Sequence, residues 1–181
     1  SFKAGETGNY TELQDLIDSN PRSIITLDKD YAYSGSDDIA KIIVSSSITI
    51  NGNGHKISGE NKAMSLYIPN DVYKVTLNNI TFVNGKYNSM LWINGNNCIV
   101  DNCTFENNSA SYGGAVYWNG TEGNLSNCNF TDCSAVASSS SSTGYSYSNS
   151  HGGAVYWDGN AGSLSGSSFI NNSAYWGGAV Y

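Results

Sequence analysis

The side chains that could carry acid–base or metal chemistry in this sequence are mostly carboxylates. A glycoside hydrolase needs two carboxyl groups facing one cleft, and a calcium-dependent lyase needs converging acidic residues with a Lys or Arg as base. Four acidic residues of the later chain instead stand isolated, namely Asp101, Glu106, Glu122 and Asp132. The chain after Lys86 contains neither Lys nor Arg. We therefore predict no catalytic residues and no enzymatic activity.

A second group of carboxylates lies early in the chain and comprises Asp28, Asp30, Asp37 and Asp38. We interpret this cluster as an exposed acidic edge loop rather than as a metal site. The two histidines, His55 and His151, are far apart in the sequence and have no partner residues at ligand spacing. The sequence thus predicts no metal and no cofactor.

The cysteines form two pairs with the same spacing, Cys98 with Cys103 and Cys128 with Cys133. This spacing does not match the close pairs of a zinc site. Cys103 and Cys128 align in neighbouring repeats, which would place their Cα atoms about 4.8 Å apart in adjacent parallel strands. That distance permits a disulfide, but aligned strands direct the two Cβ atoms side by side, so we favour stacked free thiols in the core.

The composition restricts the partners. Charged residues make up 13% of the chain, the formal net charge is -7, and Arg22 is the single arginine, so the chain lacks the basic patch that nucleic acids require. No stretch is long and apolar enough to cross a membrane, and the first residues show no signal segment. We expect any export signal or anchor to lie outside this segment. Eight Asn-x-Ser/Thr sequons give weak support for an extracellular location.

Two internal markers reveal a repeat that positions all of these residues. Gly-Gly-Ala-Val-Tyr begins at Gly113, Gly152 and Gly177, so a long spacing is followed by a shorter one. The second marker is an apolar residue at a fixed distance ahead of a phenylalanine, and it occurs at Phe82, Phe105, Phe130 and Phe169. The last spacing between these phenylalanines is again the long one. In both markers the long spacing spans the same Ser/Tyr-rich tract, residues 136–149, and exceeds the regular repeat by the length of that tract. We interpret residues 136–149 as an inserted loop.

Each repeat consists of short β-prone segments bounded by Gly and Asn, without good helix formers between them. This pattern predicts one domain over residues 1–181, an all-β, right-handed parallel β-helix of the pectate-lyase-like type. A leucine-rich repeat has a similar period, but its leucine pattern is absent. The last repeat stops midway at Tyr181, so we expect the segment to come from a longer array.

One column of the aligned repeats contains Asn79, Asn102 and Asn127. Stacked asparagines at a bend can bond to the coils above and below, so we predict a structural asparagine ladder. The alternative is that asparagine merely tolerates left-handed turn geometry there.

The first residues are expected to cap the solenoid. Residues 10–20 place Leu13, Leu16 and Ile17 on one helical face, and Thr11 and Gln14 have the spacing of a capping box. A short amphipathic helix here would cover the open first coil, because exposed strand edges invite association with other chains.

Alternation along the Gly-Gly-Ala-Val-Tyr strands separates a core face from an outer face. We assign three pairs to the core, Leu91 with Ile93, Val116 with Trp118 and Val155 with Trp157, and three pairs to the outside, Met90 with Trp92, Ala115 with Tyr117 and Ala154 with Tyr156. The outer face would then display an aromatic ladder as a candidate ligand-binding surface, formed by Trp92, Tyr117, Tyr156 and Tyr181. The alternatives are that the ladder only stabilises the stack or that the two faces are reversed.

The repeats carry a family resemblance. Gly-Gly-Ala-Val together with Phe-x-x-Asn, at Phe105–Asn108 and Phe169–Asn172, resembles the repeats of chlamydial polymorphic outer-membrane proteins. The run Ser47–His55 and the GGAVYW repeats look even more like the adhesin-like surface proteins of methanogenic archaea. Two repeats depart from Phe-x-x-Asn, with Gly85 and Cys133 in place of the final asparagine.

The resemblance implies an extracellular protein at the cell surface that adheres to a host or neighbouring cell, through a glycan or protein ligand. We predict a non-catalytic stalk or presentation scaffold. A carbohydrate-binding β-helix module is the alternative, and a polysaccharide lyase or hydrolase comes third.

Overall fold

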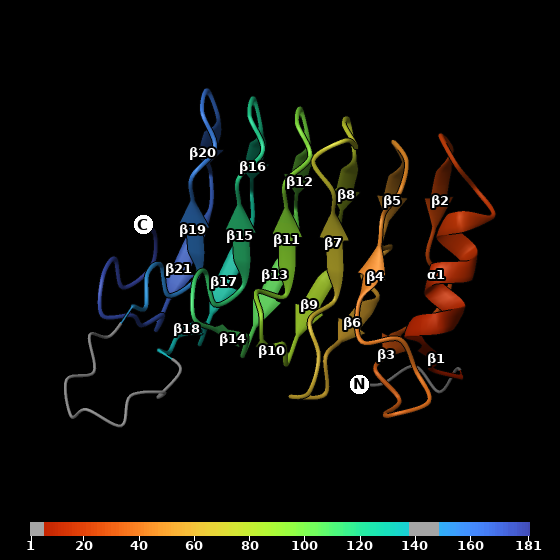
Figure 1. Cartoon of the computed structure of the whole chain (residues 1–181), viewed down its shortest axis with the longest axis horizontal. Helices are drawn as coiled ribbons and strands as arrows, with labels where there is room; N and C mark the ends of the chain where they lie inside the picture. Colours follow the sequence, from red (N-terminus) through yellow and green to blue (C-terminus); the bar gives the residue numbers. More distant parts are fainter. Residues whose placement is uncertain (1–5, 138–148) are drawn as a thin grey trace.

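The computed structural model describes residues 6–137 and 149–181 (Figure 1). In this part the chain forms a solenoid of short parallel strands with a single helix, which confirms the predicted parallel β-helix. Strands of successive coils lie side by side along the long axis, and the helix lies at the N-terminal end. Main-chain hydrogen bonds between coils therefore run along the length of the molecule.

The strands form four parallel sheets. The seven-stranded sheet contains β1 (Gly8–Asn9), β3 (Tyr31–Ala32), β6 (Lys56–Ser58), β9 (Thr81–Val83), β13 (Thr104–Glu106), β17 (Asn129–Thr131) and β21 (Ser168–Ile170). The six-stranded sheet contains β2 (Ile24–Thr26), β5 (Thr49–Asn51), β8 (Thr76–Asn78), β12 (Ile99–Asp101), β16 (Asn124–Ser126) and β20 (Ser163–Ser165). The five-stranded sheet contains β4 (Ile42–Ile43), β7 (Leu66–Ile68), β11 (Leu91–Ile93), β15 (Val116–Trp118) and β19 (Val155–Trp157), and the three-stranded sheet contains β10 (Lys86–Tyr87), β14 (Ser109–Ala110) and β18 (Ser134–Ala135).

The core is a set of columns in which like side chains stack from coil to coil. Phe82, Phe105, Phe130 and Phe169 form one such column, with ring centroids 5.0, 4.7 and 4.9 Å apart and nearly parallel planes. The strand register pairs these residues directly. The phenylalanine spacing in the sequence therefore reports the length of each coil.

The asparagine column lies at the bend between the six- and seven-stranded sheets. Asn79, Asn102 and Asn127 have left-handed backbones with φ of 52°, 52° and 53°, and all three side chains are exposed. Each donates its backbone N–H to a carbonyl of the following coil. No hydrogen bond joins one side chain of this column to the next in residues 6–137 and 149–181. The three residues connect the coils here through their backbone N–H groups, and Asn127 adds a side-chain hydrogen bond to Asp101 of the preceding coil.

Helix α1 (Tyr10–Asp18) covers the first coil and buries Tyr10, Leu13 and Ile17. The predicted capping box is wrong, because the N-cap is Asn9, whose side chain accepts the Glu12 N–H at 2.8 Å. Gln14 has a different role. Its amide accepts from the Ile43 N–H at 2.7 Å and donates to the Ile43 carbonyl at 2.9 Å, so it pairs with the free edge of β4 as another strand would.

The long spacing in the repeat is reproduced by the strand register. Val116 pairs with Leu91 of the preceding coil across the regular spacing, and with Val155 of the following coil across the long one. Tyr112 pairs with His151 across the same long interval. The extra residues therefore fall between Ala135 and His151. Most of the predicted insertion, residues 138–148, lies outside the described residues.

Candidate functional site

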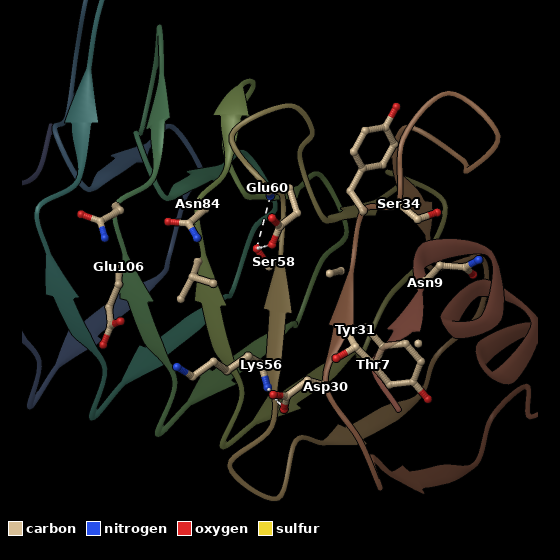
Figure 2. A pocket seen from close by; sticks show the side chains of 15 residues that line it. Thr7, Asn9, Asp30, Tyr31, Ser34, Lys56, Ser58, Glu60, Asn84 and Glu106 are labelled. Carbon is tan, nitrogen blue, oxygen red and sulfur yellow. Dashed lines mark hydrogen bonds between the residues drawn. The ribbon is translucent and has the colours of Figure 1, made fainter. Parts of the chain in front are cut away.

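A groove of about 550 Å³ runs across the outer face of the seven-stranded sheet, near the N-terminal end (Figure 2). Its floor is a row of small outward residues that pair from strand to strand, Ala32, Ser58 and Val83. The next residue of the same row is Glu106, whose longer side chain closes the floor. This groove is not predicted from the sequence, because its floor comes from four coils with unlike residues in the row.

The walls of the groove are polar. Glu60 and Asn84 line one side, whereas Asp30 and Lys56 line the other (Figure 2). Asn107 also lines the groove. Asp30 is held in place, since it accepts from the Lys56 N–H at 2.9 Å and lies 3.0 Å from His55 Nδ1. The Ser58 hydroxyl donates to Glu60 at 2.6 Å. The groove thus combines carboxylate and amide groups above a partly apolar floor.

Two of the four early aspartates have structural roles, which corrects the interpretation of the cluster as an exposed loop. Asp38 accepts from the backbone N–H groups of Tyr10, Thr11 and Ser34 and from the Thr11 hydroxyl, at 2.8–3.0 Å. Partial burial opposes the charge on Asp38, but these hydrogen bonds outweigh it and hold the pKa of the carboxyl at about 2. Asp28 and Asp37 are exposed, as expected.

The five-stranded sheet carries the predicted aromatic ladder. The register aligns Tyr67, Trp92, Tyr117 and Tyr156, and Tyr181 follows as the last ring. Tyr67 extends the ladder by one coil and was missed because its strand lacks the Gly-Gly-Ala-Val motif. The Lys41 ammonium lies 4.8 Å from the Tyr67 ring centroid and continues the column. We call these five rings the aromatic column.

The rings of the aromatic column lie against one another. Tyr117 and Tyr156 have centroids 5.1 Å apart with planes 15° apart, and Tyr156 and Tyr181 are 5.6 Å apart at 9°. Trp92 is tilted by 42° to Tyr117, with its indole N–H bonded to Asn94 at 3.0 Å. The faces of the stacked tyrosines are thus used within the column, while Tyr117 and Tyr156 stay partly exposed and Tyr181 is exposed.

The assignment of the two faces was correct for the strands and wrong for the residue ahead of each strand. Leu91, Val116 and Val155 are fully buried, whereas Trp92, Tyr117 and Tyr156 are partly exposed. The residues predicted to point outward with them, Met90, Ala115 and Ala154, are also fully buried. These residues precede short strands, so they lie at a corner where the alternation of a strand does not apply.

Two carboxylates of the later coils bond to neighbouring coils. Asp101 accepts from the Ser126 hydroxyl at 2.7 Å and from the Asn127 amide at 2.8 Å, and Asp132 accepts from Asn171. In the described part of the chain, no group of three or more His, Cys, Asp or Glu lies together as a metal site would require. His151 stacks on Tyr112 at 5.3 Å.

The four cysteines are buried free thiols. A hydrogen bond with the Cys128 thiol, together with burial, raises the pKa of Cys103. Burial also raises the pKa of Cys133 to about 11. The thiols of Cys103 and Cys133 are therefore protonated at neutral pH and behave as small core groups, because a thiolate is the reactive form of cysteine.

Two asparagines whose role was not predicted from the sequence connect coils through side-chain hydrogen bonds to the backbone. Asn108 is fully buried, accepts from the Gly85 N–H at 2.8 Å and donates to the Phe82 carbonyl at 3.0 Å. Asn172 repeats this arrangement with Cys133 and Phe130, at 2.9 and 3.0 Å. These are the final residues of the two Phe-x-x-Asn motifs. The two departing repeats, with Gly85 and Cys133, supply the backbone N–H groups that they bind.

The order and parallel pairing of the strands define a parallel β-helix of the pectate-lyase-like type. A family model, that of the putative pectate lyase-like adhesive domain, matches residues 6–117. This match covers more than half of the chain, which therefore belongs to that family. No curated protein and no solved structure was found to match the chain, so the resemblance to archaeal and chlamydial surface proteins stays a prediction. No helix in residues 6–137 and 149–181 is long and apolar enough to span a membrane.

Proposed function

We propose that the chain is a non-catalytic segment of a cell-surface adhesin, which presents adhesive surfaces to another cell or to surface glycans. The observation that carries this proposal is the aromatic column, which runs over successive coils on the outer face of the five-stranded sheet. Aromatic side chains with one polar end are enriched where proteins bind partners. Membership in an adhesive-domain family supports the same role.

The stacking within the column determines how a partner would be bound. The faces of Tyr117 and Tyr156 are covered by neighbouring rings, so a ligand would meet ring edges and phenolic hydroxyls. Burial raises the pKa of both phenols above the ordinary value. The hydroxyls therefore stay protonated at neutral pH and both donate and accept hydrogen bonds.

The non-catalytic part of the proposal is supported by the carboxylates. Asp101 and Asp132 bond to side chains of adjacent coils, Asp38 bonds to the start of helix α1, and Asp30 bonds to Lys56 N–H. Carboxylates fixed in this way act as hydrogen-bond acceptors that connect coils.

A double substitution tests the adhesive role of the column. Changing Tyr117 and Tyr156 to Phe keeps the ring stack and removes both hydroxyls, so we expect reduced binding to target cells and to a glycan array with an almost unchanged Tm. The matched change of both residues to Ser removes the stack as well, and it should lower both binding and Tm. Full adhesion by the Phe variant would show that the hydroxyls are not needed for binding, and full adhesion by both variants would show that the column serves only the stability of the solenoid.

A further inference from the structure

We infer that the groove on the seven-stranded sheet is a binding site for a short, uncharged, hydroxyl-rich saccharide. The groove lies on a different sheet from the aromatic column. The inference extends the proposed adhesive role and rests on it only in taking a saccharide as the ligand.

The dimensions of the groove suit such a ligand. A volume of about 550 Å³ lies within the range of roughly 300–1,000 Å³ that is usual for small-molecule sites. The floor crosses four adjacent strands, from Ala32 on β3 to Glu106 on β13. At about 4.8 Å per strand, three steps give a length of about 14 Å along the solenoid axis. A short chain of sugar rings can lie along this direction.

The space above the floor depends on residue size. Val83 lies outside the continuous hydrophobic core and is 8% exposed at the floor of the groove, and only small side chains precede it in the same row. The equivalent positions in the next coils are Glu106, Thr131 and Ile170. A floor of methyl and methylene groups can contact the C–H faces of sugar rings, whereas polar groups above it bind their hydroxyls.

The walls favour hydroxyl groups over anions. Glu60 and Glu106 offer carboxylate acceptors, and the amides of Asn84 and Asn107 both donate and accept. Such mixed groups match sugar hydroxyls, which also donate and accept. Three carboxylates line the groove against one lysine, namely Asp30, Glu60 and Glu106 against Lys56. This negative balance disfavours uronate, sulfate and phosphate groups.

Binding can be tested by NMR titration of the whole chain with cellohexaose, N-acetylchitohexaose and hexagalacturonate. We expect at least one of the two neutral hexasaccharides to shift the backbone amide signals of Ser58, Val83 and Glu106 at millimolar concentration. Hexagalacturonate should not shift them. The inference is overturned if neither neutral hexasaccharide moves these signals, or if hexagalacturonate binds there more tightly.

Matched variants locate the site. Val83→Phe fills the groove and should weaken binding at least about tenfold, a loss of about 1.4 kcal/mol. Thr131→Phe changes the same outward row two coils further on, outside the groove, and should leave binding unchanged. Glu106→Gln keeps the shape and removes one charge, and it should weaken binding about threefold or more. It replaces Val83→Phe as the test if that variant does not fold.

The two proposals can fail separately. Loss of saccharide binding in Val83→Phe with intact cell adhesion would support the groove as a saccharide site and show that adhesion does not depend on it. Equal saccharide binding by Val83→Phe, Thr131→Phe and the unaltered chain would overturn the groove and leave the test of Tyr117 and Tyr156 unaffected.

Discussion

Asn108 is a buried side chain that connects its own coil to the preceding coil, outside the hydrogen bonds between paired strands. Its amide satisfies the Gly85 N–H and the Phe82 carbonyl, both of the preceding coil. A buried backbone group left without a partner costs about 1–3 kcal/mol. The final asparagine of Phe-x-x-Asn is therefore a structural requirement of the turn.

The change Asn108→Ala should lower the free energy of unfolding by about 2–4 kcal/mol, because it leaves two buried backbone groups unpaired. Asn172→Ala is the matched control. Asn172 makes the same two bonds in the last coil but is partly exposed, so water can replace its amide and the loss should be about 1 kcal/mol or less. Denaturant unfolding measures both values. Equal losses for the two variants would contradict this account.

Asp38 gives a pH-dependent contribution. Its folded pKa of about 2 lies below the usual value of about 3.9 for an unfolded Asp. The stabilisation is therefore complete above about pH 5 and is lost as the pH falls toward 2. We expect Asp38→Asn to cost about 1–2 kcal/mol at pH 7, after allowance for solvent screening, and to match the unaltered chain near pH 2. Thermal melts over this range provide the measurement, with exposed Asp37→Asn as the control. A difference that stays constant with pH would exclude the proposed origin.

At the level of elements, the strands of each coil pair in register with those of the coil before it, so an insertion can be located from the register. Ala110 pairs with Ala135, and Tyr112 pairs with His151. In the earlier coil Ser111 alone separates the two paired residues. Removing residues 136–149 would join Ala135 directly to Ser150, and the segment Ala135–Ser150–His151 would then reproduce Ala110–Ser111–Tyr112.

Deletion of residues 136–149 should consequently leave the fold intact. Loop-closure entropy changes slowly with loop length, so a shorter connection costs or gains little. We expect Tm to change by no more than a few degrees, which corresponds to about 1 kcal/mol for a domain of this size. Circular dichroism melts test this prediction. Loss of the cooperative transition would show that the tract belongs to the core.

For the whole molecule, the sequence predicted those features that repeat and missed those that depend on differences between coils. Stacked Phe82, Phe105 and Phe130 report the register directly, so the solenoid and the outer position of Tyr117 could be derived from spacing. The groove could not, because its floor depends on small residues in unlike coils. The burial of Met90 could not be predicted either, because this residue lies at a corner ahead of a strand, where the alternation of inward and outward side chains does not apply.

The distribution of charged residues over the coils leads to a prediction about catalysis. Such a prediction is needed because β-helices with a related fold include enzymes that act on polysaccharides. The described coils offer no cluster of acidic ligands for Ca²⁺. The chain after Lys86 contains no Lys or Arg that could act as the base of a lyase, so such a base is missing from the later coils, although Lys56 lines the groove. Two glutamates do line the groove, but Glu60 is bonded to the Ser58 hydroxyl.

We therefore expect no cleavage of pectin, polygalacturonate or pseudomurein, with or without Ca²⁺, in assays of released reducing ends and unsaturated products. A hydrolase would require one carboxyl group to donate a proton while a second acts as base or nucleophile. The substitutions Asp101→Asn, Asp132→Asn and Glu106→Gln each test one carboxylate. Reproducible product release that disappears in any one of them, with the fold intact, would establish catalysis and assign it to that carboxylate, whereas release that persists in all three would show that none of these three carboxylates is required.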